Sequence, residues 1–268
     1  MYNCSRYILA LLLLLIGSPA FGQTETLSQF WNEYAFTHDL SEKWVVELDA
    51  GLNTSSVPMD NSIFHGFTQF STRAWVHYYP SDRWKVSFFC AYYFNVNVPE
   101  LNQNRAPEYR FAFQATYNLL KHRRINVNLR GRLEDRNIQD ESGVFEAVER
   151  FRFQARVVYP LNKPKIERNA IYAFISDEVY FKTKSRISGR DFFDRNRATG
   201  GLGYKAAKDV QIEVSYANEY LPRTVIDKVY NALQVNLTFS NLFSPKDKKV
   251  FERKETAVDD GAPSGGGG

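Results

Sequence analysis

Apolar and polar residues alternate almost without a break from residue 28 to residue 242 of this 268-residue chain. The segment 109–119 shows the pattern best: Tyr, Phe, Ala and Leu fill one set of alternate positions, and Arg, Ala, Gln, Thr and Asn fill the other. A period of two places these sets on opposite faces of a β-strand. The alternation therefore predicts a chain of β-strands that each carry one apolar and one polar face.

Several of the alternating segments are longer than the five or six residues usual for strands of soluble proteins. They cover residues 31–38, 44–53, 64–79, 86–96, 109–119, 125–136, 150–159, 170–182, 195–204, 210–216 and 233–239. Short turns and longer polar loops alternate between them, as they do in outer-membrane barrels. We therefore predict an all-β fold, a transmembrane antiparallel up-and-down β-barrel of roughly 10–12 strands, with its apolar face toward lipid and its polar face toward the lumen.

The strand count contains a conflict. Eleven segments alternate, whereas bacterial single-chain barrels have even numbers of strands. A last strand that ends at the short-turn rim would also make the first segment begin outside the cell. Either residues 31–38 form no barrel strand, which leaves ten, or residues 64–79 hide two strands, which gives twelve; we slightly prefer twelve.

A soluble β-sandwich or lipocalin-like barrel is the alternative fold, and its apolar face would pack inward. It accounts less well for charges that recur on the polar faces of neighbouring strands. Aromatic residues near the strand ends also favour a membrane, because interfacial girdles place such rings at the level of the lipid headgroups. These residues are Tyr78, Tyr79, Trp84, Tyr117, Tyr159, Tyr204, Tyr216 and Tyr220.

Residues 1–22 have the features of a secretory signal peptide. Arg6 supplies the positive charge, residues 8–16 form the apolar run, and small residues follow, so we place cleavage before Gln23. A membrane-anchoring helix is the alternative, but a spanning helix needs about 20 apolar residues. An exported chain without such a helix points to the outer membrane of a Gram-negative bacterium.

The barrel is expected to cover residues 23–243. Its end carries Phe239, Leu242 and Phe243, an aromatic finish of the kind that barrel-assembly machinery recognises, so we expect this machinery and outer-membrane lipid as partners. Residues 244–268 lose the alternation and become first charged and then glycine-rich. They are expected to form a disordered periplasmic tail.

Charge and cysteine content exclude several functions. The formal net charge of +4 falls to +3 when Arg6 leaves with the signal, which is too small to indicate a nucleic-acid partner. Cys90 is then the remaining cysteine and lies on an apolar face, as a buried or lipid-facing thiol. We expect neither a metal nor a cofactor, because no His/Cys cluster or phosphate-binding loop occurs. The glycines within 200–203 lie inside a predicted strand, where they would leave space for bulky arginines.

The polar faces carry a set of charged residues that we expect to line the lumen. The set comprises Arg110, Arg130, Arg132, Glu134, Arg136, Arg150, Arg152, Arg156, Glu178, Arg195 and Arg197. In one interpretation these charges pair across strands, with further acids such as Glu108 and Glu213, and stiffen or fill the lumen. In the other, surplus arginines form a path for small anionic solutes, because arginine stays charged and binds carboxylates and phosphates.

Catalysis requires a nucleophile with a base within hydrogen-bond reach. The histidines are His38, His65, His77 and His122, and none lies in a local motif with a serine. His77 follows Trp75 on the inward face near the short-turn rim. We therefore expect no enzyme, with a lipid hydrolase or acyltransferase as the alternative.

Several short motifs combine arginine, glutamate and aromatic residues. They are Phe30-Trp31, residues 39–44, residues 130–136, residues 149–153, and Arg195-Asn196-Arg197 followed by residues 201–204. In these motifs the chain resembles the Bacteroidota-type outer-membrane family catalogued as domain of unknown function 2490. The resemblance covers nearly the whole mature chain and implies a location and a barrel fold, but no catalytic residues.

We accordingly expect a structural barrel or a narrow channel with an Arg/Glu-lined lumen. Three alternatives stay open: an anion-selective porin for acidic solutes, a lipid-modifying enzyme, and a scaffold that binds a partner through its outer loops or its tail.

Overall fold

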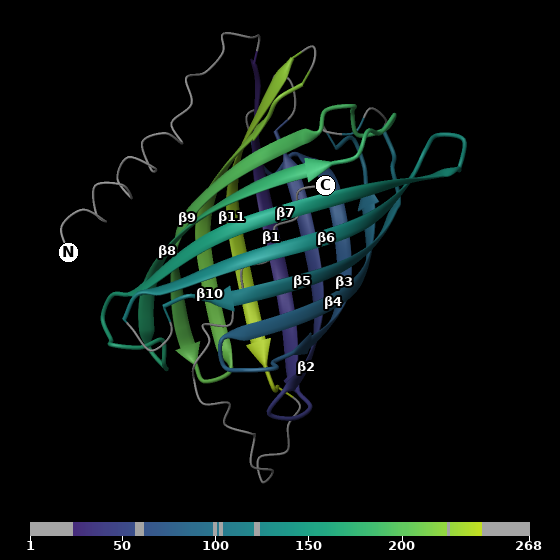
Figure 1. The fold of residues 1–268 in the computed structure, drawn as a ribbon. Helices are drawn as coiled ribbons and strands as arrows, with labels where there is room; N and C mark the ends of the chain where they lie inside the picture. Colours follow the sequence, from purple (N-terminus) through teal and green to yellow (C-terminus); the bar gives the residue numbers. More distant parts are fainter. Residues whose placement is uncertain are drawn as a thin grey trace, which may run out of the picture.

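Eleven β-strands form one closed barrel in the computed structural model, which describes residues 24–56, 62–98, 101, 104–120, 124–223 and 226–242 (Figure 1). The strands are β1 (Thr24–Asp39), β2 (Trp44–Ser55), β3 (Gly66–Tyr78), β4 (Trp84–Asn95), β5 (Glu108–Asn118), β6 (Asn126–Gln139), β7 (Phe145–Pro160), β8 (Ala170–Lys182), β9 (Phe193–Ala207), β10 (Val210–Leu221) and β11 (Asp227–Ser240). The predicted signal peptide and tail lie outside the described residues. Within the described ranges, no helix is long and apolar enough to span a membrane.

The barrel closes through a parallel pair between its first and last strands. β1 runs beside β11 from Thr24↔Asp227 to Thr37↔Ser240, and the other ten neighbouring pairs of the described barrel are antiparallel. An odd number of strands requires this closure, because the first and last strands of an up-and-down meander then point the same way. The choice between ten and twelve was therefore wrong: the first segment is a full strand, and residues 64–79 contain a single one.

The two rims of the barrel differ. Short turns follow β1, β3, β5 and β9 on one side of the barrel, where the longer connection 161–169 after β7 also lies and where β11 ends; we call this side the short-turn rim. The long connections after β2, β4 and β8 lie at the opposite, long-loop rim, where β1 begins. The loop between β6 and β7 is shorter than expected, since both strands extend into the segment 137–147.

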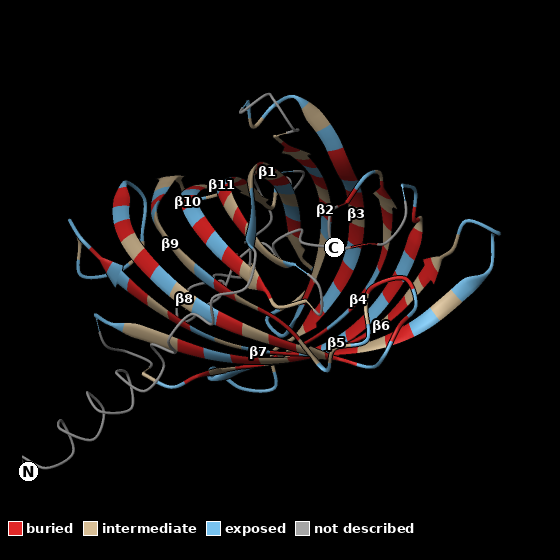
Figure 2. Ribbon diagram, turned by 90° about the horizontal axis from the view of Figure 1, so that it is seen from above, coloured by how far each residue is buried: buried red, intermediate tan, exposed pale blue. Residues whose placement is uncertain are grey.

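Burial alternates along most of the strands, so that buried and exposed bands succeed one another, with the main irregularity in β9 (Figure 2). On β7 the outward Phe153 is 56% exposed, whereas its neighbour Arg152 is 1% exposed. Large apolar side chains cover the outside, and arginines, acids and amides fill the inside. This distribution is the inverse of a soluble protein, in which charged residues are almost never fully buried, and it is the distribution of a membrane-spanning barrel.

Aromatic residues mark the outer surface near the short-turn rim. Trp44 lies 4.6 Å from Tyr78, and Trp84 lies 4.8 Å from Tyr117, measured between ring centroids. Both tryptophans are about half exposed. Cys90 is also exposed, on the outward side of β4. The outer face of the barrel therefore joins an apolar band to aromatic rings at one rim, as interfacial girdles do.

Candidate functional site in the barrel lumen

The structure places all eleven charged residues of the predicted lumenal set inside the barrel, none more than 6% exposed. Period-two alternation explains this placement, because their outward neighbours are apolar or small at most positions. Among the described residues, the lumen holds ten buried arginines and eight buried carboxylates. The electrostatics of the lumen therefore depend on how these groups pair.

Glu134 of β6 binds three arginines. One of its oxygens lies 2.6 Å from Nε of Arg150, and the other lies 2.8 Å from Nη1 of Arg152 and 3.3 Å from Nη1 of Arg132. The carboxylate is fully buried. Charge-assisted hydrogen bonds of this kind are about twice as strong as neutral ones, so Glu134 links β6 tightly to β7.

Glu178 of β8 forms a second centre that shares Arg152 with the first. Nε and Nη2 of Arg152 donate to the two carboxylate oxygens of Glu178 at 2.9 and 3.0 Å. Nη2 of Arg130 donates to Oε1 of Glu178 at 2.8 Å. The hydroxyl of Tyr180 also donates to this carboxylate, at 2.7 Å. Arg152 thus bridges Glu134 and Glu178 and joins three strands into one network.

Glu108 of β5 and Glu219 of β10 extend the network on both sides. Arg136 binds Glu108 with two nitrogens, at 2.7 and 2.9 Å, and Arg110 lies 2.7 Å from the same carboxylate. Glu219 accepts a bond of 2.7 Å from Arg195 and also binds Arg197. We call this assembly the ion-pair layer, comprising Arg110, Arg130, Arg132, Arg136, Arg150, Arg152, Arg195 and Arg197 with Glu108, Glu134, Glu178, Asp194 and Glu219.

Two acids of the ion-pair layer were missing from the sequence analysis. Glu219 lies beyond the predicted end of its strand, because the outward Asn218 breaks the apolar alternation. Asp194 and Arg195 are both buried at the start of β9, where a register shift opposite Tyr180 lets consecutive residues face inward. Asp194 binds Arg195 at 2.9 Å. These two carboxylates reduce the arginine surplus that the sequence indicated.

Arg132 shows how the barrel stabilises an arginine that has no carboxylate at short distance. Its Nε donates to the amide oxygen of Gln114 at 2.8 Å. Its guanidinium carbon lies 5.3 Å from the ring centroid of Trp75 and 5.6 Å from that of Phe89. Ring faces attract cations at such distances, so an amide and two aromatic rings supplement the distant contact with Glu134.

An apolar cluster adjoins the ion-pair layer toward the long-loop rim. We call it the apolar cap; it comprises Val98, Leu101, Ala106, Ile138, Val148 and Ile187. Ile138 and Val148 face inward from β6 and β7 and are fully buried, while the others come from the loops after β4 and β8. These described parts of the loops after β4 and β8 therefore cover the ion-pair layer with apolar side chains.

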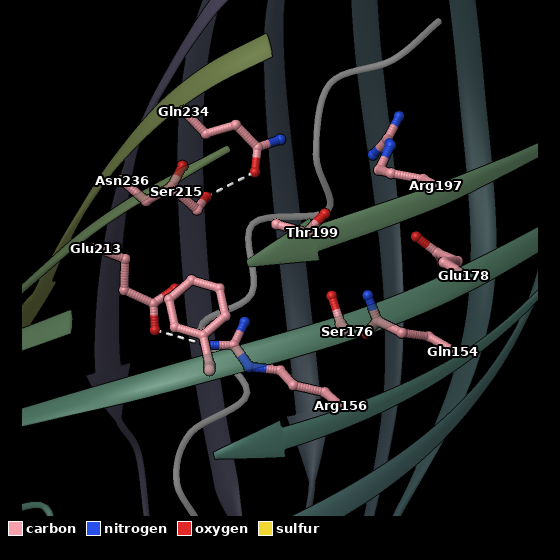
Figure 3. A pocket seen from close by; sticks show the side chains of 11 residues that line it. Gln154, Arg156, Ser176, Glu178, Arg197, Thr199, Glu213, Ser215, Gln234 and Asn236 are labelled. Carbon is pink, nitrogen blue, oxygen red and sulfur yellow. Dashed lines mark hydrogen bonds and ion pairs between the residues drawn. The ribbon is translucent and has the colours of Figure 1, made fainter. Parts of the chain in front are cut away.

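A pocket lies on the other side of the ion-pair layer, nearer the short-turn rim. Its empty volume is about 340 Å³, including the part open to solvent. We call it the lumenal pocket; β7 to β11 contribute its lining, which comprises Gln154, Arg156, Phe174, Ser176, Glu178, Arg197, Thr199, Glu213, Ser215, Gln234 and Asn236 (Figure 3). Arg156 donates to Glu213 at 2.7 Å, and Ser215 donates to Gln234 at 2.9 Å.

Gly203 shapes the wall beside this pocket. A Cβ atom at Gly203 would collide with the ring of Tyr172 on the neighbouring strand β8. The ring occupies that space, and its hydroxyl donates to Glu213 at 2.6 Å. The expectation that these glycines make room for arginines was therefore wrong at this position, since Gly203 makes room for a tyrosine.

Sequence reasoning also missed a contact at His77. Nδ1 of His77 lies 2.8 Å from Oγ of Ser87, and its Nε2 lies 3.6 Å from Glu47. The sequence could have indicated this contact, because a tight turn after Tyr79 makes His77 and Ser87 cross-strand partners in a hairpin. This is the order of a catalytic serine, base and acid, but Ser87 is only 1% exposed.

Within the described residues, no group of His, Cys, Asp and Glu could hold a metal ion.

Comparison with known proteins gives distant structural similarity and one family. No curated protein matches the sequence. Among solved structures, the NanC porin has a TM-score of 0.46 at 16% identity, over 79% of this chain and 98% of the porin. LpxR from Salmonella typhimurium has a TM-score of 0.47 at 11% identity, over 77% of this chain and 86% of LpxR. The model of one family, described as "Protein of unknown function (DUF2490)", matches residues 28–230, and the chain belongs to this family.

Proposed function

We propose that this protein is a structural barrel of the Gram-negative outer membrane whose lumen is closed by its own ion pairs. One observation carries the proposal: Glu108, Glu134, Arg136 and Arg150, in the middle of the ion-pair layer, have no exposed surface. The apolar outer face supports contact with outer-membrane lipid. We further propose that β11 is the strand through which the barrel contacts its assembly machinery.

The geometry of the arginines argues against an anion path. A basic ring that selects anions must offer its N–H groups to the passing solute. Here Nε of Arg136, Arg150 and Arg152 already donates to carboxylates at 2.6–2.9 Å. An anion would have to displace a buried carboxylate from its arginines, which would leave that charge unpaired in a dry layer.

Planar-bilayer conductance tests the closed lumen. The refolded protein, shown to be folded by its heat-modifiable mobility on gels, should give no discrete conductance steps. The double variant Arg152→Ala with Glu178→Ala removes two large side chains without changing the net charge, and it should produce steps. Phe153→Ala on the outer face is the matched control and should stay silent. Anion-selective steps in the unaltered protein would overturn the proposal in favour of a porin.

We also propose that the barrel is not an enzyme. The contact between His77 and Ser87 is the arrangement most like a catalytic pair in the described lumen, but a serine 1% exposed offers no path for a substrate. A fluorophosphonate probe, which labels activated serines, should leave the folded protein unmodified. Labelling that disappears in Ser87→Ala and in His77→Gln would contradict this proposal and identify a lumenal hydrolase.

A further inference from the structure

We propose that the lumenal pocket binds a small, uncharged, polyhydroxylated solute of the sugar or polyol class. The site is distinct from the ion-pair layer that closes the barrel, although the two share Glu178 and Arg197 as their boundary. Solvent reaches the pocket, because its inward-facing residues Gln154, Ser176 and Thr199 are partly exposed.

Three buried polar atoms of this pocket lack a hydrogen-bond partner in the described protein. They are Nε of Arg156, Oε2 of Glu213 and Nδ2 of Asn236. Each of these residues is more than nine-tenths buried and lines the pocket. Native proteins seldom leave buried polar atoms unsatisfied, since each costs the free energy of its lost hydration. Unpartnered buried atoms also occur elsewhere in the described lumen, among them Nη1 of Arg136, but these three line one pocket that solvent reaches, where a bound molecule can supply the missing partners.

The three atoms also define the chemistry of that molecule. Arg156 and Asn236 offer donors, and Glu213 offers an acceptor. A hydroxyl group both donates and accepts, so a solute with several hydroxyls can satisfy all three. Amide and hydroxyl side chains supply most of the remaining lining, namely Gln154, Ser176, Thr199, Ser215 and Gln234.

Charge balance selects an uncharged solute. Arg156 is paired with Glu213 inside the pocket, and at its boundary Arg197 is paired with Glu219 while Glu178 is paired with Arg152. An anionic solute would face the unpartnered oxygen of Glu213, and a cationic one would face the unpartnered Nε of Arg156.

The same polar surface continues across the wall of the barrel. Asn128 is the direct cross-strand partner of Arg156, and Asn118 is the partner of Asn128. Nδ2 of both asparagines is buried without a hydrogen-bond partner in the described protein. A solute bound beside Arg156 therefore has further amide donors within one or two strands.

Saturation-transfer NMR on the full, detergent-solubilised protein tests the proposal. The probes are glucose and mannitol as uncharged solutes, gluconate as the anion and glucosamine as the cation. Glucose or mannitol should receive saturation, and both charged analogues should bind about tenfold more weakly, as the loss of one hydrogen bond of ordinary strength would give. Preferential binding of gluconate would overturn the proposal and indicate an anion site.

Variants locate the binding. Asn236→Leu keeps the approximate size of the side chain but removes a donor, and Glu213→Gln removes the charge. Each should weaken binding of the uncharged probe about tenfold, whereas Asn218→Leu, on the outer face of β10, should not. Heat-modifiable mobility confirms that each variant is folded. If no uncharged probe binds, water alone satisfies the three atoms and the proposal is wrong; binding that Asn236→Leu leaves unchanged would place the solute elsewhere and also overturn it.

Discussion

The ion-pair layer and the lumenal pocket both bury polar groups, but they differ in how these groups are paired. In the ion-pair layer, each carboxylate binds two or three cationic or phenolic donors, and water is excluded. In the lumenal pocket, one ion pair is surrounded by amides and hydroxyls, and one polar atom each of Arg156, Glu213 and Asn236 lacks a protein partner. Both halves derive from the same alternation of outward apolar and inward polar residues. Period-two patterning thus places polar groups in the lumen, whereas the balance of charges and amides at the inward positions decides how those groups pair with one another.

The largest expected effect distinguishes the halves directly. Glu134→Ala leaves Arg132, Arg150 and Arg152 without their shared carboxylate, and loss of one partner of a buried ion pair costs about 3–5 kcal/mol. Asn236→Ala removes a group whose Nδ2 is unpartnered, so the free energy of unfolding should fall by less than about 1 kcal/mol. Urea unfolding in detergent micelles, followed by tryptophan fluorescence, measures both. Equal losses would contradict the contrast between the halves.

The apolar cap provides the next test. Ile138→Ala creates a cavity above the ion-pair layer and should lower the free energy of unfolding by about 2–5 kcal/mol. Leu133→Ala, on the outer face of the same strand, opens no cavity inside the barrel and should cost much less. Hydrogen exchange should rise at the long-loop rim in the first variant alone. A rise at the short-turn rim instead would show that the cap does not protect the charges beneath it.

Gly203→Ala tests the wall of the lumenal pocket. The added methyl group collides with Tyr172, so the ring must move and its bond to Glu213 is lost; overpacking of this kind costs about 1–3 kcal/mol. Gly131→Ala is the matched control, because its Cβ would lie 3.9 Å from Phe153, an ordinary contact. Thermal unfolding should separate the two variants. Identical melting would mean that Tyr172 moves aside without cost.

The smallest effect is expected at Asn128. Its Nδ2 is buried without a partner, so Asn128→Ala removes an unsatisfied group along with some packing, and the free energy of unfolding should change by less than about 0.5–1 kcal/mol. Asn95→Ala is the comparison at the other end of the lumen, since the Asn95 amide donates to the Ala106 carbonyl and accepts from Gln69. That variant should lose more. A larger loss at Asn128 would show that its amide holds a bound molecule even in the purified protein.

Much of the fold could be predicted from period two alone. Alternation identified the eleven strands and the inward positions of residues such as Arg132 and Arg152. The start of β1 was missed because residues 24–30 carry polar groups on both faces, and their pairing with β11 leaves no local signal. The expectation of an even number of strands also failed. A parallel pair between the first and last strands closes the barrel, and such a pair leaves no signal in either strand alone.

The site was less predictable than the fold. Alternation indicates which side chains face inward, but not which carboxylate meets which arginine across several strands. Arg156 of β7 and Glu213 of β10 are 57 residues apart, and two strands lie between theirs in the sheet, so no local pattern indicates that they meet. The bulge that turns Asp194 inward depends on the register of two strands. Unpartnered atoms such as Nδ2 of Asn236 cannot be identified at all until every neighbour has been placed.

The parallel seam between β1 and β11 has a consequence for how the molecule folds. The strands that meet there are separated by almost the whole barrel: Thr24 pairs with Asp227. Hairpins such as β3–β4 can form from neighbouring residues, whereas the seam requires a long chain to close on itself, and the entropic cost of that loop must be met before its hydrogen bonds form. We therefore expect the ladder between β1 and β11 to form last. Until it forms, both edge strands present unpaired backbone N–H and C=O groups, with which strands of other chains can pair.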